Sequence, residues 1–134
     1  MNNNKEKLEF LKYILLGCVK DKVHIDLFLQ NDIIPDKNII KSIVDVPQSR
    51  IEGMDEPSEG FTMIGFKRLN NLHEMLDYVR TNNISGDLIE TGVWRGGATI
   101  FMRYYCKIYD LNKKVFVCDS FKGLPKPSGK FDAD

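Results

Sequence analysis

One short segment limits what this chain can fold into more than any other: residues 87–97, with the sequence DLIETGVWRGG. Aliphatic residues at its centre stop at an acid, Glu90, and glycines follow before an apolar-periodic stretch begins. This order is typical of a parallel β-strand that leads through a tight turn into the N-terminus of a helix, where α/β folds bind nucleotide-like ligands. The sequence therefore predicts an α/β fold with a ligand site at this turn.

The acid in this segment indicates the charge of the ligand. Glu90 stands where the strand ends, so an anionic pyrophosphate would be repelled there and a cationic ligand would be attracted. S-adenosylmethionine carries a positive sulfonium and an ammonium group, and it therefore suits a turn flanked by a carboxylate. A structural alternative stays open, because Glu90 could be an ordinary acid favoured by the helix dipole, and Gly92, Gly96 and Gly97 could merely form a tight connection.

Apolar spacing predicts the elements around this segment. Helices are expected over residues 5–20, 63–82 and 97–110, and strands over residues 87–91 and 115–119. A strand, a helix and a second strand in this order form a βαβ unit, which is right-handed in nearly all known proteins. Between residues 21 and 61, prolines, glycines and an acidic cluster predict a long loop, which in a compact domain is usually a functional lid or a disordered segment.

A second acid follows the second predicted strand. Asp119 comes twenty-two residues after Gly97 (97 to 119), near the spacing at which an acid meets a ribose hydroxyl in dinucleotide-binding folds. The alternative is a turn-forming aspartate before Ser120. Trp94 and Arg95 are bulky where a pyrophosphate loop needs small residues, and the sequence assigns neither a chemical role.

Three blocks of the sequence resemble the macrocin O-methyltransferase (TylF/MycF-type) family. They are residues 87–103, residues 62–69 with TMIG and KRL, and residues 119–125 with DSF and GLP. Such enzymes methylate sugar hydroxyls of natural products with S-adenosylmethionine and a divalent metal, magnesium. The resemblance implies a partial Rossmann-like class I methyltransferase fold, in which two N-terminal helices precede the βαβ unit. The fold is expected to be truncated, because members of the family are much longer than this chain.

The resemblance also implies which residues bind the cofactor. They are Met63, Glu90, Thr91, Gly92, Val93, Gly96, Asp119, Ser120 and Phe121. It divides the chain into residues 1–61, an N-terminal helix with a lid-like loop, and residues 62–134, the N-terminal part of the S-adenosylmethionine-binding domain. The metal-binding aspartates of the family lie in its C-terminal half. No matching motif occurs here, so the resemblance gives this chain no metal ligand and no catalytic base.

Composition narrows the range of partners. Nineteen basic and nineteen acidic residues cancel, so no global charge favours nucleic acid or an anionic membrane. Three widely spaced cysteines without a CxxC pair, and an N-terminus without a signal-like apolar core, favour a reduced, cytoplasmic protein. The expected partner is a small-molecule acceptor, a glycosylated natural product or sugar. Two strands with unpaired edges also allow a homo-oligomer.

A P-loop is excluded, because no Gly-Lys-Ser/Thr follows the glycines. Two other functional interpretations stay open. A nicotinamide-binding Rossmann half is the nearest enzyme alternative, although its G-x-G-x-x-G needs glycines closer together than Gly92 and Gly96, and Glu90 is unfavourable for a pyrophosphate. The non-enzyme alternative is a catalytically inactive remnant that binds cofactor weakly or acts only by association.

Overall fold

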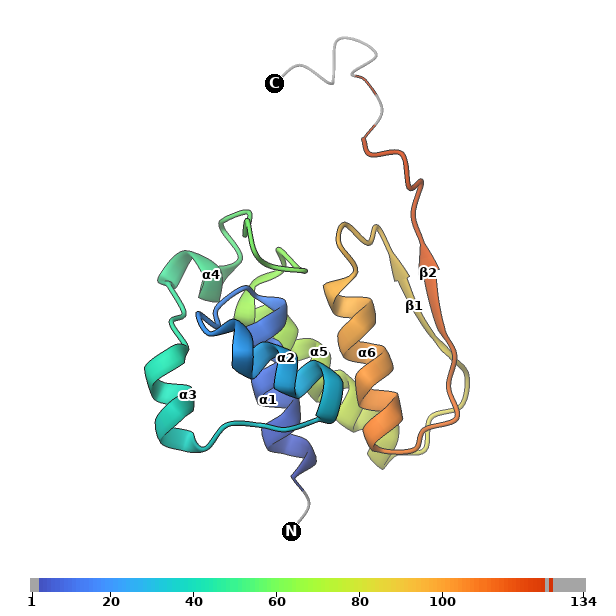
Figure 1. The fold of residues 1–134 in the computed structure, drawn as a ribbon. Coiled ribbons are helices and arrows are strands. Elements are labelled where there is room, and N and C mark those ends of the chain that lie inside the picture. Colours follow the sequence, from blue (N-terminus) through green and yellow to red (C-terminus); the bar gives the residue numbers. More distant parts are fainter. Residues whose placement is uncertain (1–2, 125, 127–134) are drawn as a thin grey trace.

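The chain folds into a helical body beside a small parallel sheet (Figure 1). The structure, a computed structural model, describes residues 3–124 and 126. The elements over these residues are α1 (Asn4–Leu15), α2 (Lys22–Asn31), α3 (Lys37–Ile43), α4 (Gln48–Glu52), α5 (Gly65–Thr81), β1 (Leu88–Thr91), α6 (Gly97–Ile108) and β2 (Val115–Cys118). β1 and β2 are parallel, with Leu88 opposite Val115 and Thr91 opposite Cys118. The α/β class and the βαβ unit expected from the sequence are therefore confirmed.

The segment between residues 21 and 61 contains three helices, so the expectation of a long loop there is wrong. Asp21 caps α2 by accepting a hydrogen bond of 2.8 Å from the N–H of Val23, and the Asp36 side chain caps α3 in the same way. These caps satisfy donors that the start of a helix leaves unpaired, which helps short helices to form. Among the described residues, five helices precede β1 instead of the two expected.

The apolar core lies among α1, α2, α5 and α6. Phe10 of α1 and Phe28 of α2 meet edge to face in it, with 5.4 Å between their ring centroids, a geometry that aromatic pairs favour. Phe101 and Tyr105, one helical turn apart on α6, are fully buried in the same core. Ile100, also on α6, is 41% exposed and is not part of this core.

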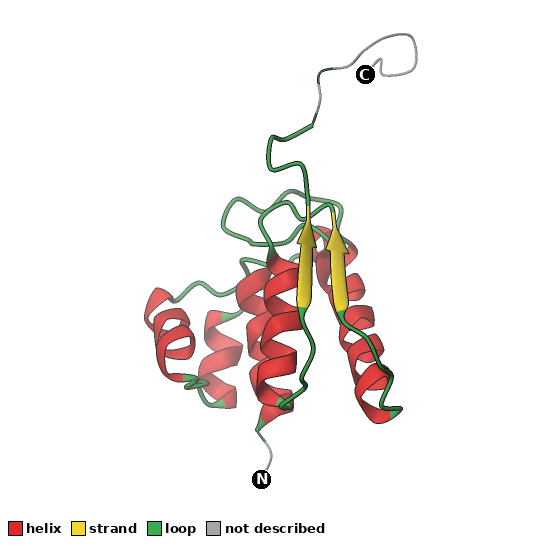
Figure 2. Ribbon diagram, turned by 90° about the vertical axis from the view of Figure 1, so that its right-hand side faces the viewer, coloured by secondary structure: helices red, strands yellow, loops and turns green. Residues whose placement is uncertain are grey.

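Within the described part of the chain, helices cover only one face of the sheet. Figure 2 looks onto the opposite face, over which no described helix lies. Ile89 and Phe116, partners in the strand register, are 60% and 50% exposed on this face. Parallel sheets are normally buried on both faces, so the described part of the chain leaves bare a surface that a complete α/β fold covers.

We expect the bare sheet face to cause self-association. Phe116→Glu should shift the protein toward monomer, because a charge on this face opposes apolar contact without disturbing the core. Size-exclusion chromatography with light scattering, over a range of protein concentrations, measures the effect. Val23→Glu is the matched control, since Val23 is 64% exposed on α2, away from the sheet. An unmodified protein that is monomeric at every concentration would contradict this expectation.

A buried lysine of α1, Lys12, pairs with an acid on its own helix and links α1 to α5. Lys12 is 2% exposed, and its Nζ donates hydrogen bonds to Glu9 Oε1 at 2.6 Å and to Asn70 Oδ1 at 2.7 Å. His73 of α5 lies 3.7 Å from the same Glu9 oxygen and packs edge to face against the ring of Phe101. Burial alone would raise the pKa of Glu9, but the hydrogen-bonding groups and charges of His73 and Lys12 outweigh it and lower the pKa to about 2.

Acid should therefore weaken the contact between α1 and α5. A carboxyl group whose pKa is lowered in the folded state contributes stability that is complete above its unfolded pKa of 4.5 and is lost as the pH falls toward about 2. Because the Glu9 side chain is 36% exposed, solvent screening reduces this contribution to about 1–2 kcal/mol. In denaturant titrations, Glu9→Gln should flatten the acid limb of the stability curve, whereas Glu74→Gln, at an exposed position of α5, should not. Identical curves for both variants would refute the role of Glu9.

Candidate functional site

The turn between β1 and α6 lies at the C-terminal end of the sheet. Gly92 and Gly96 have φ values of +79° and +83°, in the left-handed region that glycine adopts without strain. The N–H of Gly92 donates to the carbonyl of Cys118 at 2.9 Å, which joins the turn to the end of β2. A Cβ added at Gly92 would meet nothing within 4 Å. The backbone of this turn is therefore open to a ligand.

Glu90 lies in β1 on the face that packs toward α6. It is half-buried, and its carboxylate accepts a hydrogen bond from the hydroxyl of Thr99 in the first turn of α6. This bond fixes the orientation of the carboxylate between strand and helix. Thr91, the next residue, is exposed on the opposite face, and Val93 is buried under the turn. Thr99 was not predicted as a site residue, although a hydroxyl residue in the first turn of the helix was a usable signal.

Asp119 bridges the ends of the two strands. Its Oδ2 accepts a hydrogen bond of 2.7 Å from the N–H of Val93, and its Oδ1 accepts one of 2.9 Å from the N–H of Phe121. These bonds, that from Val93 foremost, lower the pKa of Asp119 below its usual value, so the group is ionised at neutral pH. Ser120 and Phe121 are exposed on the loop that follows. Asp119 thus has the turn-forming role that the sequence left open, and its charge faces the same end of the sheet as the glycine turn.

The residues before α5 pack against this turn, and we call residues 57–63 the capping segment. The N–H of Gly97 donates to the carbonyl of Phe61 at 2.8 Å. A Cβ at Gly97 would come within 2.6 Å of both that oxygen and the Cβ of Thr62, so only glycine permits this approach. Thr62 is buried in the contact and does not cap α5, because the N-cap position is Ile64.

Arg95 holds the capping segment at several further points. Its Nη1 donates to the carbonyls of Pro57, Ser58 and Gly60 at 3.0, 2.9 and 3.1 Å. The guanidinium group also lies over the ring of Trp94, 4.3 Å from its centroid. The sequence assigned neither residue a role, because the partners of Arg95 are backbone carbonyls 35 to 38 residues upstream, which no local pattern reveals.

Removal of this guanidinium should free the capping segment. Arg95→Ala deletes hydrogen bonds from a charged donor, worth about 1.5–3 kcal/mol each when buried and less here because the group is partly exposed. Amide hydrogen exchange over residues 57–61 should become about tenfold faster, which corresponds to about 1.4 kcal/mol. Arg95→Lys should restore protection only in part, because an ammonium group lacks the planar fork. Arg103→Ala, an exposed arginine of α6, is the control. Unchanged exchange in Arg95→Ala would show that these contacts do not hold the segment.

The charges at the turn fit a cationic ligand better than an anionic one. In α/β folds, a pyrophosphate binds the free N–H groups at a helix N-terminus. Here the N–H of Gly97 is taken by the carbonyl of Phe61, and the carboxylate of Glu90 is bonded to the first turn of the same helix. The chemistry of the donor set therefore suits the sulfonium and ammonium groups of S-adenosylmethionine, and it is unfavourable for a nicotinamide dinucleotide.

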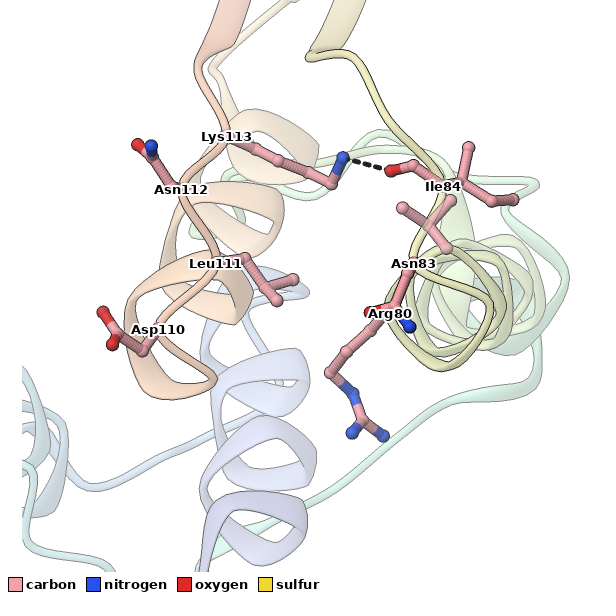
Figure 3. Close-up of a pocket in the computed structure, with 8 residues that line it drawn as sticks. Arg80, Asn83, Ile84, Asp110, Leu111, Asn112 and Lys113 are labelled. Atoms are coloured by element: carbon pink, nitrogen blue, oxygen red, sulfur yellow. Dashed lines mark hydrogen bonds between the residues drawn. The ribbon is translucent and has the colours of Figure 1, made fainter.

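A small hollow lies at the opposite end of the sheet (Figure 3). Its volume is about 230 Å³, and it is lined by the end of α5 and by the connection from α6 to β2. Lys113 donates to the carbonyls of Ile84 at 2.7 Å and Gly86 at 2.6 Å, and so ties together the two segments that lead into the strands. Because α/β folds bind ligands at the carboxyl ends of their strands, we assign this hollow a structural role.

Residues 3–124 and 126 contain neither a metal-binding cluster nor a helix that could span a membrane. No group of three or more histidine, cysteine, aspartate or glutamate side chains in this part of the chain is arranged to hold a metal ion. None of its helices has the length and the run of apolar residues that crossing a bilayer requires.

A glycine turn at the carboxyl end of a parallel βαβ unit, with an acid near the end of each strand, is typical of a Rossmann-like fold that binds a nucleotide-like cofactor. A family model described as Macrocin-O-methyltransferase (TylF) matches residues 5–134. The chain belongs to this family, as its three sequence blocks indicated.

Individual relatives agree with this assignment. The chain is 43% identical over 100 residues to the Mycinamicin III 3''-O-methyltransferase of Micromonospora griseorubida, a match that covers 74% of this chain and 39% of that protein. It is 47% identical over 78 residues to the 8-demethyl-8-(2,3-dimethoxy-alpha-L-rhamnosyl)-tetracenomycin-C 4'-O-methyltransferase of Streptomyces olivaceus, over 58% and 30% of the two chains. The structure of the O-methyltransferase NovP matches with a TM-score of 0.70 at 34% identity, over 96% of this chain and 48% of that one. In each case the matched part covers less than half of the relative's own length.

Proposed function

We propose that this chain forms the cofactor-binding part of an S-adenosylmethionine-dependent O-methyltransferase that methylates a sugar hydroxyl of a natural product. The observation that carries the proposal is the open glycine turn between two acids, Glu90 and Asp119. The N–H of Gly97, to which an anion would otherwise bind, already donates to the carbonyl of Phe61. The named relatives support the acceptor class, since their names describe methylation of mycinamicin III and of a rhamnosyl tetracenomycin.

The two acids hold opposite ends of the cofactor in this proposal. Glu90 attracts the cationic methionine end, and Asp119 accepts a hydrogen bond from a ribose hydroxyl. The other proposed contacts are Met63, Thr91, Gly92, Val93, Gly96, Ser120 and Phe121. Met63 is 40% exposed at the end of the capping segment, which supports a contact from that side. When bound, the cofactor supplies the methyl group, and the residues of this chain bind it, orient it and limit the access of water.

The metal and the acceptor-activating base are proposed to come from the rest of the fold. The resemblance to the family implies magnesium, and the described residues of this chain contain no cluster that could hold it. The two strands also form only part of the substrate-facing edge of the sheet. By itself, the chain is therefore expected to bind cofactor without transferring its methyl group. A turnover assay with radiolabelled S-adenosylmethionine, magnesium and a macrolide glycoside would detect any transfer.

Cofactor preference tests the proposal directly. In calorimetric titrations, S-adenosylhomocysteine should bind and NAD⁺ should not. Preference for NAD⁺ would favour the nicotinamide alternative, and binding of neither would remove the support for a cofactor site in this chain. Mixing the chain with a polypeptide that carries the remaining strands of the fold separates part of an enzyme from an inactive remnant. Methyl transfer in the mixture supports the first, and its absence in a stable complex supports the second.

A further inference from the structure

We infer that a hollow between α1, α2 and the capping segment receives the apolar, non-sugar part of the acceptor, the aglycone. The inference rests on the proposed function and extends it from the sugar hydroxyl to the rest of the acceptor. The hollow has a volume of about 610 Å³. Proteins bind drug-sized ligands in cavities of about 300–1,000 Å³, so the space suits a macrolide or a fused aromatic ring system.

The walls of the hollow are largely apolar. Ile14 belongs to α1, Val19 follows that helix, Ile25 lies on α2 and Phe61 belongs to the capping segment. Phe61 is 44% exposed, although aromatic side chains of this size are usually well buried. Ile14 is already buried, so an apolar ring system placed here would remove from water chiefly the exposed surface of Val19, Ile25 and Phe61, which favours binding.

Charged residues at the rim of the hollow indicate a neutral ligand. Lys20 and Lys22 lie there together with Asp26 and Glu59, so positive and negative charges balance. Lys20 is also paired with Asp45 at 2.8 Å, which leaves less positive charge for a ligand. A nucleoside diphosphate sugar is negatively charged, and the rim of the hollow has no excess of positive charge to bind it. The rim therefore favours a finished glycoside over a nucleotide-activated sugar as the acceptor.

The capping segment connects the hollow to the cofactor turn. The side chain of Phe61 lines the hollow, while its carbonyl accepts the N–H of Gly97 at the start of α6. The N–H groups of Phe61 and Thr62 both donate to the carbonyl of Leu15 at the end of α1, at 2.7 and 3.2 Å. The segment is thus fixed between α1 and α6 (Figure 1). When the aglycone occupies the hollow, only the capping segment separates it from the cofactor turn. The sugar of the glycoside must reach that turn.

A titration without cofactor tests the assignment. Mycinamicin III is the probe, uridine diphosphate glucose is the charged comparison, and amide chemical shifts of the ¹⁵N-labelled chain report where each binds. Shifts are expected at the residues that line the hollow, and the glycoside should bind more tightly than the nucleotide sugar. Ile25→Trp fills the hollow and should weaken glycoside binding about tenfold or more. Val23→Trp, on the same helix but 64% exposed, should leave it unchanged.

A second variant guards against misfolding of the first. Phe61→Ala removes one wall without adding volume, and it should weaken glycoside binding about fivefold. Equal effects of Ile25→Trp and Val23→Trp, shifts confined to the bare sheet face, tighter binding of the nucleotide sugar, or no glycoside binding would each overturn the inference. Because the titration contains no cofactor, its result is independent of the S-adenosylhomocysteine experiment. Glycoside binding without cofactor binding would retain the hollow as a glycoside site and refute the proposed methyl transfer.

Discussion

Gly97→Ala is expected to lower the free energy of unfolding by about 3 kcal/mol, near the upper end for overpacking. The new Cβ would lie 2.6 Å from the carbonyl oxygen of Phe61 and 2.6 Å from the Cβ of Thr62. Neither neighbour is the end of a flexible side chain, so the capping segment itself must move away from α6. Denaturant titration measures the loss, and faster hydrogen exchange over residues 57–62 should accompany it.

Gly92→Ala is the matched control for this substitution. Gly92 has a positive φ, so alanine there carries backbone strain of about 1–2 kcal/mol, but its Cβ would meet no atom within 4 Å. The control should therefore be less destabilising than Gly97→Ala and should leave exchange in the capping segment unchanged. Equal losses of stability in the two variants would mean that the contact with Phe61 and Thr62 is not what requires glycine at Gly97.

Asp119→Ala should weaken the binding of S-adenosylhomocysteine about ten- to a hundredfold. The substitution removes a charged acceptor, whose hydrogen bonds contribute about 1.5–3 kcal/mol each, and it also releases the N–H of Val93 that shapes the turn. Calorimetric titration measures the change. Glu74→Ala, which removes an exposed acid of α5 far from the turn, should bind normally.

Asp119→Asn separates the two contributions of this carboxylate. Asparagine keeps an oxygen that can accept the N–H of Val93, but it loses the negative charge and one acceptor. If ligand contact dominates, Asn and Ala should weaken binding to a similar degree. If the carboxylate acts mainly on the turn, Asn should bind almost normally. Unchanged affinity in both variants would remove Asp119 from the cofactor site.

The βαβ unit was predictable because its signals are local. An apolar strand, a glycine turn and an amphipathic helix follow directly in the sequence, and the observed strands begin and end within one residue of the expected positions. The helices between residues 21 and 61 were missed because α3 and α4 have only seven and five residues, too few for apolar periodicity to appear. Their prolines and glycines were taken as loop signals, whereas Asp21 and Asp36 were N-caps that could have indicated α2 and α3.

The candidate site was predictable only in its acids and glycines. Glu90 and Asp119 were identified by their places at the ends of strands, and the structure brings both to the end of the sheet that carries the turn. The contact of Arg95 with residues 57–60 was missed because it is made to backbone carbonyls distant in sequence. Hydrogen bonds of this kind depend on how the chain is folded in space, and a single sequence carries no pattern that marks them.

The position of Trp94 makes the turn observable by its own fluorescence. It is the only tryptophan in the sequence, it is 38% exposed, and the cationic group of Arg95 lies over its ring. Emission excited beyond the absorption band of tyrosine therefore arises from this turn alone. Changes of charge or polarity at the turn alter the intensity and wavelength of that emission, so ligand titrations need no attached dye. Rearrangements confined to the distant helices leave the same signal unchanged, and the natural chromophore thereby separates events at the turn from events elsewhere in the molecule.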